Sequence, residues 1–393
     1  MSNIKCEIYD LETYRNQFLY CSMDFLTKET IVFEVSTEVD DRLLIYEHLS
    51  HVTHQIGYNN KGFDYPIIEY VLLNKSKLLL VKPEDFSWMI HEKAQELIGN
   101  DSWYKPQLKI AQLDLYKLNH FDRFKISLKY CGFGLRMPVL QDLPVRYDAM
   151  LSSEEMAVMR KYVINDVETT YALYIHSKPL IELRKQSKID YNFDCSSMSN
   201  TAVARNVFIK DYCAATGISR YELKELKTDY HFLYPRDVIS NKIKFETPKY
   251  QELLNKLMLD NTNLIESNLK YTFNCNTIVT ALGKGGAHSI NNPSYYDNKN
   301  MLLWDWDWSA FYPNIILFLK LAPKHINRDI YLNIIRKLLQ AKIDYQAAGD
   351  KLRTLASKIS INSSFGMLSS EGSPTKDISV LYSVSNVAEL KGC

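Results

Sequence analysis

Strand-like and helix-like segments alternate over about the first 180 residues, and this order constrains the possible fold more than any other feature of the chain. Residues 4–9 and 30–35 are rich in Ile, Val, Phe and Tyr and are bounded by polar segments, which is typical of strands. Helical patterns cover residues 41–50, 63–74 and 154–176. Strands that alternate with helices predict an α/β domain.

Length and composition limit the remaining possibilities. A chain of 393 residues is too long for one hydrophobic core and suits two or three domains. Lys and Arg together number 47 and Asp and Glu 46, a balance that excludes no class of partner, because a DNA enzyme confines its basic residues to a groove. The seven scattered cysteines form no Cys-x-x-Cys pair and predict reduced thiols in a cytosolic protein. The charged N-terminus and the short apolar runs predict neither a signal peptide nor a membrane span.

Carboxylates close the first expected strand. Side chains two residues apart on a strand point to the same face, so Asp10 and Glu12 are expected side by side at its end. Two carboxylates held so close repel each other unless a divalent cation neutralises them. A solvated strand end is the alternative, and the Asp-x-Glu pattern alone does not exclude it.

Two later segments carry further acids. Asp64 follows the turn-rich stretch 57–63 and enters an expected helix, where the helix dipole stabilises a carboxylate. Tyr162 and Asp166 are four residues apart in an expected helix and therefore share a face. A plain helix cap and a half-buried helix face are the structural alternatives for these two segments.

In this order the three segments resemble the three motifs of proofreading 3′–5′ exonucleases: Asp-x-Glu, Asn-x(2–3)-Phe/Tyr-Asp and Tyr-x-x-x-Asp. The resemblance implies an RNase H-like domain in which four acids hold two Mg²⁺ or Mn²⁺ ions and Tyr162 orients the attacking water. It also implies that Asn60 and Phe63 contact the terminal nucleotide. Ser127 and Leu128 resemble an element of the same family that grips the single-stranded primer, although a surface strand explains them nearly as well. The implied metal ligands are Asp10, Glu12, Asp64 and Asp166.

A second set of motifs lies near the C-terminal end. The stretch 304–316 is expected to be a strand ending in the carboxylate of Asp307, followed by a turn at Tyr312 and Pro313. About forty residues later, Lys358 and Asn362 lie one helical turn apart, before the small residue Gly366. An amphipathic helix with a solvated lysine face is the alternative for this second segment.

The ordered pair resembles the first two polymerase motifs of family B DNA polymerases, Asp-x-x-Ser-Leu-Tyr-Pro and Lys-x-x-x-Asn-Ser-x-Tyr-Gly. The resemblance implies that Asp307 binds metal, that Tyr312 packs under the deoxyribose, and that Lys342, Lys358 and Asn362 contact the incoming dNTP. Ala310 stands where the family has Ser. The glycines Gly285 and Gly286 resemble an element that moves the primer between the two active sites of some phage-type members.

The resemblance divides the chain into an exonuclease domain (1–185), a connecting region (186–300) and a partial palm (301–326 and 367–393) with fingers helices (327–366). Primer-template DNA and dNTPs are the implied partners, in the cytoplasm of a bacterial host if the chain is phage-encoded. The third polymerase motif, Tyr-x-Asp-Thr-Asp, is missing, so we expect an incomplete polymerase half. A gene fragment, an interrupted gene and a split subunit completed by a second polypeptide are the alternatives. A stand-alone 3′–5′ exonuclease with a vestigial polymerase half and a non-catalytic DNA-binding remnant are the alternatives; the presence of all four exonuclease acids disfavours the second.

Overall fold

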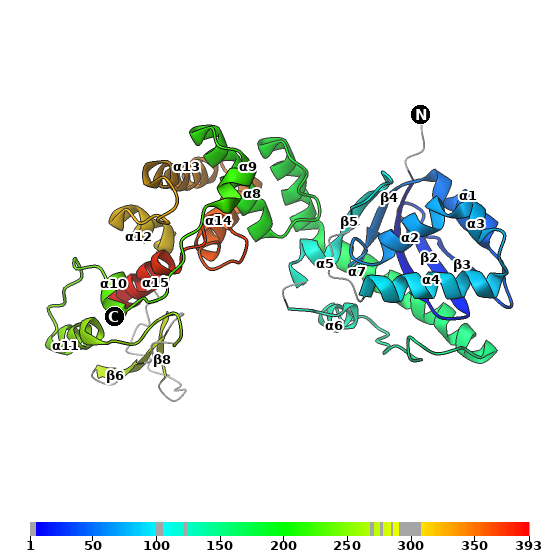
Figure 1. The fold of residues 1–393 in the computed structure, drawn as a ribbon, viewed down its shortest axis with the longest axis horizontal. Helices are drawn as coiled ribbons and strands as arrows, with labels where there is room; N and C mark the ends of the chain where they lie inside the picture. Colours follow the sequence, from blue (N-terminus) through cyan, green and yellow to red (C-terminus); the bar gives the residue numbers. More distant parts are fainter. Residues whose placement is uncertain are drawn as a thin grey trace, which may run out of the picture. The chain divides into compact units, whose positions relative to one another are not determined.

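The alternating segments of the N-terminal half form a mixed five-stranded sheet in the computed structural model, with the strand order β3-β2-β1-β4-β5 (Figure 1). Strand β1 pairs antiparallel with β2, and β2 with β3, whereas β1–β4 and β4–β5 are parallel. The mixed α/β class expected from the sequence is therefore confirmed. The strands are β1 (Lys5–Thr13), β2 (Gln17–Asp24), β3 (Thr30–Ser36), β4 (Val52–Gly57) and β5 (Ala111–Asp114).

The structure describes residues 5–98, 105–121, 124–267, 271–275, 278–283, 286–290 and 308–392. The chain divides into two compact units, Met1–Ser199 and Asn200–Cys393, and each is described by itself.

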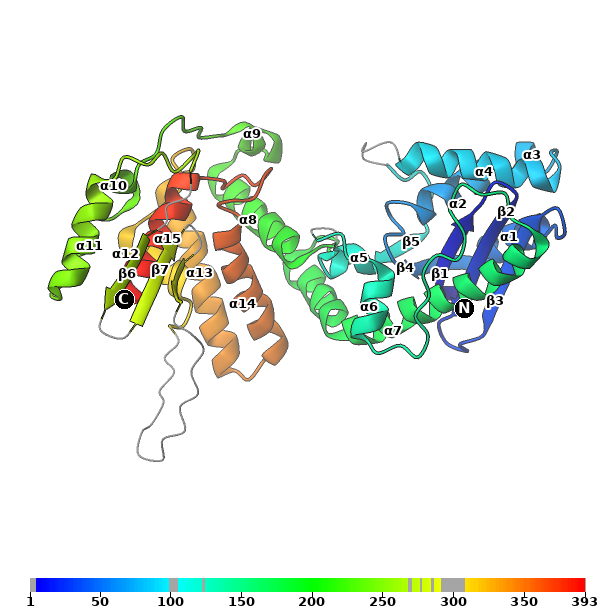
Figure 2. The same cartoon turned by 90° about the horizontal axis from the view of Figure 1, so that it is seen from below.

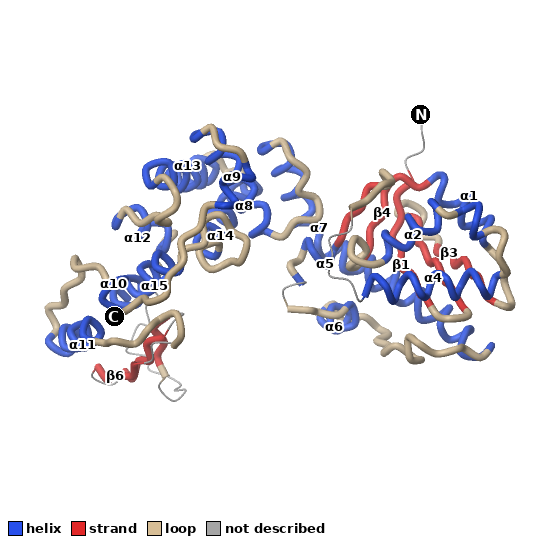
Figure 3. The backbone as a smooth tube through the Cα atoms, in the orientation of Figure 1, coloured by secondary structure: helices blue, strands red, loops and turns tan. Residues whose placement is uncertain are grey.

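Helices cover both faces of the large sheet (Figures 1 and 3). Alternate residues of β1 point in opposite directions: Tyr9 and Leu11 pack against the helices of one face, and Ile8 packs against α7 on the other. Asp10 and Glu12 have the same parity as Ile8, so they belong to the α7 face. The helices of the first unit are α1 (Arg42–His51), α2 (Asp64–Leu73), α3 (Lys75–Leu78), α4 (Pro83–Ile98), α5 (Leu115–Leu118), α6 (Leu128–Gly134) and α7 (Ser153–Tyr191).

Helix α7 is longer than the pattern over 154–176 predicts. It begins at a capping box, in which the Ser152 hydroxyl accepts from the Glu155 amide and the Glu155 carboxylate accepts from the Ser152 amide. It continues past Pro179 to Tyr191. Ile181 and Leu183, which follow the proline, are buried, and their packing offsets the loss of the hydrogen bond that proline cannot donate.

The described residues of the second unit form a hydrophobic core built mainly from helices, with a small antiparallel sheet β6-β7-β8 (Figure 2). Helices α8, α13 and α14 lie side by side within it. Its elements are α8 (Asn200–Thr216), α9 (Arg220–Glu225), α10 (Pro235–Val238), α11 (Pro248–Leu259), β6 (Tyr271–Cys275), β7 (Ile278–Gly283), β8 (Gly286–Ser289), α12 (Phe311–Leu319), α13 (Arg328–Ala347), α14 (Lys351–Gly366) and α15 (Ile378–Gly392).

The expected turn at Tyr312 and Pro313 was wrong. These two residues lie in the first turn of α12, where proline is tolerated because the amide it lacks has no partner inside the helix. The chain enters this helix through Ala310, which has a left-handed backbone with φ of 49°. The expected strand before it, with Asp307, lies outside the described residues.

Candidate metal centre

Three carboxylates from β1 and α7 converge on one point. Each of Asp10, Glu12 and Asp166 offers an oxygen, and these oxygens lie within 4.8 Å of one another. Strand parity directs the first two toward α7, and the helix brings Asp166 to them from more than 150 residues away in the sequence. All three side chains are half-buried.

A fourth carboxylate, that of Asp64, lies beside this cluster. Asp64 is the first residue of α2, is only 4% exposed, and lines a cavity of about 370 Å³ together with the three clustered acids. Burial raises the pKa of Asp64 to about 7. Hydrogen bonds donated by its own amide and by that of Leu11 act in the opposite direction and lower this pKa.

The carboxylates of the cluster are buried close to one another, and this raises their pKa values. Burial raises the pKa values of Asp10 and Glu12 well above the usual range, and the neighbouring carboxylates Asp64 and Asp166 raise them further. Burial also raises the pKa of Asp166 to about 6. Carboxylate oxygens at this spacing are ligands that suit Mg²⁺ or Mn²⁺. A bound cation would offset the repulsion between the carboxylates and so lower their pKa values.

Tyr162 lies one helical turn before Asp166 on the same face of α7 and is half-buried. Its side chain hydrogen-bonds to the Asp166 carboxylate, which acts to lower the pKa of that acid. A phenol held beside the carboxylates can orient a water molecule there.

The loop between β4 and α2 forms one wall of the cavity, but not with the asparagine expected. Asn59 and Phe63 line the cavity, whereas the Asn60 side chain is fully buried and donates to Gln112 Oε1 at 2.7 Å. Gly57 is required for this packing, because a Cβ atom there would lie 2.7 Å from Asn60 Cβ.

Asp114, a buried acid for which the sequence suggested no role, holds this loop. Its Oδ1 accepts hydrogen bonds from the amides of Asn59, Tyr116 and Lys117 at 3.0–3.3 Å. Its own amide donates to Ser197 Oγ at 3.1 Å. The available signal was a single acid at the end of a short strand, a frequent N-cap position.

Aromatic rings supply much of the remaining wall. Tyr58 and Tyr116 both line the cavity, with ring centroids 5.2 Å apart in an edge-to-face arrangement. Leu128 also lines it, while the Ser127 hydroxyl accepts from the Tyr130 amide as the N-cap of α6. The segment is thus a helix start and not the surface strand considered as the alternative.

Two of the residues expected to bind dNTP, Tyr312 and Lys342, contact other side chains of the second unit. The rings of Tyr312 on α12 and Phe365 on α14 have centroids 4.3 Å apart. Lys342 Nζ on α13 donates to Ser309 Oγ at 3.3 Å.

Lys358 and Asn362 are exposed, one turn apart on α14, with no recorded contact to those residues in the part of the chain that the structure describes. Gly286 opens strand β8. Gly285 lies outside the described residues.

The fold of this chain is similar to that of the family B DNA polymerase from the hyperthermophilic archaeon Pyrobaculum calidifontis, with a TM-score of 0.54 and 14% sequence identity over 98% of this chain. The match covers 50% of that polymerase chain, so this chain spans half the length of the protein it resembles. No protein-family model and no curated protein matches the sequence.

None of the helices in the described residues combines the length and the apolar character that crossing a membrane requires.

Proposed function

We propose that the first unit is a metal-dependent 3′–5′ exonuclease and that the whole chain is part of a family B DNA polymerase. The carrying observation is the convergence of Asp10, Glu12 and Asp166 within 4.8 Å, beside the buried Asp64. The fold similarity to a family B polymerase supports the same proposal.

In this proposal the four carboxylates hold two Mg²⁺ or Mn²⁺ ions around the 3′-terminal phosphodiester. Divalent cations supply charge neutralisation of the phosphate and an activated water. Tyr162 orients the attacking water through its hydroxyl group, as its position beside Asp166 allows. The rings of Phe63, Tyr58 and Tyr116 offer an apolar surface on which the unpaired terminal bases can stack. Such stacking does not depend on which base is present.

The polymerase half belongs to the second unit in this proposal, with its palm in residues 301–326 and 367–393 and its fingers in 327–366. Tyr312 would pack under the sugar, Lys342 and Lys358 would neutralise the triphosphate, and Asn362 would border the base pair. Asp307 would hold metal. Nucleotide addition would also need the carboxylates of an Asp-Thr-Asp motif, which this sequence does not contain, and a second polypeptide is the proposed source.

The deciding experiment follows digestion of single-stranded DNA, labelled at its 5′ end, with Mg²⁺ or Mn²⁺. The wild-type chain should shorten the strand from its 3′ end one nucleotide at a time. The double variant Asp10→Asn with Glu12→Gln removes two ligand charges and should lower the rate by at least about a thousandfold, or ~4 kcal/mol in the barrier.

The control variant, Asp85→Asn, removes an exposed acid of α4 and should retain wild-type activity. Folded wild-type protein that binds DNA without shortening it would favour the non-catalytic DNA-binding remnant. Digestion that depends on the acids, together with no role in synthesis under any reconstitution, would favour the stand-alone exonuclease.

A further inference from the structure

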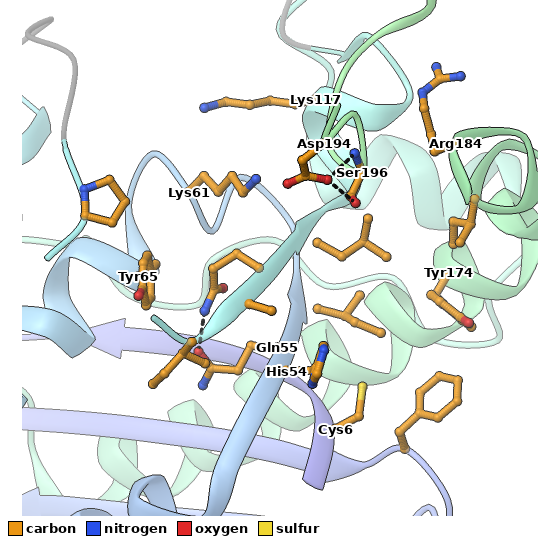
Figure 4. A pocket seen from close by; sticks show the side chains of 18 of the residues that line it. Cys6, His54, Gln55, Lys61, Tyr65, Lys117, Tyr174, Arg184, Asp194 and Ser196 are labelled. Carbon is orange, nitrogen blue, oxygen red and sulfur yellow. Dashed lines mark hydrogen bonds between the residues drawn. The ribbon is translucent and has the colours of Figure 1, made fainter. Parts of the chain in front are cut away.

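A second cavity, of about 760 Å³, lies beside the edge strand β5 in the first unit (Figure 4). None of the four carboxylates of the metal centre lines it. Its size is that of pockets which bind small molecules.

Basic side chains dominate the charged groups of its lining. Five are basic and only one, Asp194, is acidic; the basic residues are Lys61, Lys117, Arg184, Lys185 and Lys188. Arg184 donates to the Met198 carbonyl at 2.8 Å, and Lys185 pairs with Glu182 at 2.7 Å. The remaining three lysines have no recorded ion pair among the described residues.

Three of these cations are close enough to influence one another or the single acid. Burial lowers the pKa of Lys61, and the charge of Lys117 lowers it further, against the opposite effect of Asp114 and Asp194. Hydrogen bonds from Ser196 and the charges of Lys188 and Lys61 lower the pKa of Asp194, although burial acts to raise it. Figure 4 shows the Lys61 ammonium group directed toward Asp194 and Ser196. An anion placed here would relieve the repulsion between the lysines.

An apolar surface adjoins this cationic end. Leu108, Ile110 and Leu113 are half-buried and line the cavity along β5 and the segment before it, and Tyr65 closes it on the side of Lys61 (Figure 4). The cavity therefore suits a ligand with a phosphate at one end and a flat, largely apolar group at the other.

The same short segments form walls of both cavities. Lys61 and Gly62 line this second cavity, while Asn59 and Phe63 of the same loop line the cavity of the metal centre. Beyond β5, Lys117 lines the second cavity and Tyr116 lines the cavity of the metal centre. The Asp114 carboxylate accepts hydrogen bonds from the backbone amides of Tyr116 and Lys117.

We propose that the second cavity binds a nucleoside 5′-phosphate, either as a free mononucleotide or as one unit of a DNA strand. The phosphate lies against Lys61, Lys117 and Lys188, and the base lies against Leu108 and Ile110. The choice of a nucleotide over another amphipathic anion rests on the proposed function, because the two cavities share a loop.

Equilibrium binding in EDTA tests this proposal without metal-dependent digestion of the DNA probe. The probes are dAMP, deoxyadenosine and a dT decamer, each titrated against the full chain by calorimetry. dAMP should bind at least about tenfold more tightly than deoxyadenosine, because its phosphate makes charge-assisted contacts that the nucleoside lacks. Tighter binding of dAMP identifies the free nucleotide as the source, whereas tighter binding of the decamer identifies a passing strand.

Two kinds of variant locate the binding. Lys61→Gln with Lys188→Gln should weaken dAMP binding about tenfold or more. Lys82→Gln with Lys178→Gln removes the same charge from exposed lysines outside the cavity and should change it less than about twofold. Ala111→Trp fills the cavity without changing charge and should also abolish binding, so a folding defect in one variant cannot decide the outcome.

Equal weakening by both double variants, full binding by Ala111→Trp, or no binding of dAMP and of the decamer would overturn the proposal. Exonuclease activity is measured separately with Mg²⁺. Loss of acid-dependent digestion with intact dAMP binding would refute the proposed function and leave this cavity standing, and the reverse result would refute only the cavity.

Discussion

At the scale of single residues, the chemistry of the candidate site follows from carboxylates placed where water is scarce. Asp10 and Glu12 share a face because β1 is a strand, and the sequence pattern was sufficient to predict this. The motif resemblance pointed to Asn60 as the residue beside the nucleotide, whereas Asn59 lines the cavity. The two asparagines adjoin, and only the close approach of Gly57 and the contact with Gln112 turn Asn60 inward.

Tyr162→Phe tests the proposed orientation of water. The ring and its packing remain, so the free energy of unfolding should change by less than about 1 kcal/mol. The exonuclease rate at saturating DNA should fall about 10- to 100-fold, because the water is no longer held in line. Single-turnover digestion measures this rate. An unchanged rate would remove Tyr162 from the proposed site, and Tyr171→Phe, a half-buried tyrosine on the same helix, serves as the control.

The raised pKa values predict a pH-dependent stability. Asp64 titrates near 7 and Asp166 near 6 in the folded chain, mainly because of burial, whereas unfolded carboxyls titrate near about 4. The native state therefore binds more protons, and this contribution to stability is full below about pH 4 and is lost as the pH rises to about 7.

In EDTA, the melting temperature of the wild-type chain should fall more steeply between about pH 5 and pH 8 than that of Asp64→Asn. Mg²⁺ should reduce this difference in slope, because the cation replaces the protons. Parallel slopes for the two proteins in EDTA would contradict the prediction. Thermal melts followed by circular dichroism at several pH values provide the measurement.

At the scale of elements, the β4–α2 loop depends on an anchor that lies more than fifty residues later in the sequence. The Asp114 carboxylate ties this loop to the start of α5, and the Asp114 amide ties β5 to Ser197. Hydrophobic periodicity carries no information about such contacts, so the sequence indicated the helix α2 and the turn-rich stretch before it but not what fixes the loop.

Asp114→Ala should remove the acceptor of three backbone amides and destabilise the first unit by about 2–4 kcal/mol. It should also weaken metal binding, because the loop leads directly into Asp64. Asp114→Asn keeps an oxygen acceptor and should retain most of both properties. Chemical denaturation and Mn²⁺ titration separate the two effects; equal losses in the two variants would mean that charge, and not the acceptor, holds the loop.

At the scale of the whole molecule, the hydrophobic clusters of the two units have no residue in common within the described ranges. The clusters of the first unit run from Ile8 to Ile181, and the cluster of the second begins at Phe208. Each unit therefore buries its own apolar surface, which is the physical condition for independent folding.

A protein of residues 1–199 should accordingly fold by itself and digest single-stranded DNA at a rate within about threefold of that of the full chain under saturating conditions. Loss of the cooperative melt in this shortened protein would show that the second unit contributes to folding of the first. Loss of digestion with an intact melt would show that the second unit supplies part of the site.

The sequence by itself determined the α/β class of the first unit, the helices α1 and α2, part of α7, and the common face of Asp10 and Glu12, because period-two and period-3.6 patterns are local properties. The resemblance to exonuclease motifs implied that Asp64 and Asp166 join them, and the structure brings an oxygen of Asp166 within 4.8 Å of theirs, with Asp64 beside them. Only the structure decided that Asp114 anchors the loop and that Lys61, Lys117 and Lys188 line a second cavity. These are contacts between segments far apart in the chain. They arise when sheet and helices pack, and no local pattern specifies them.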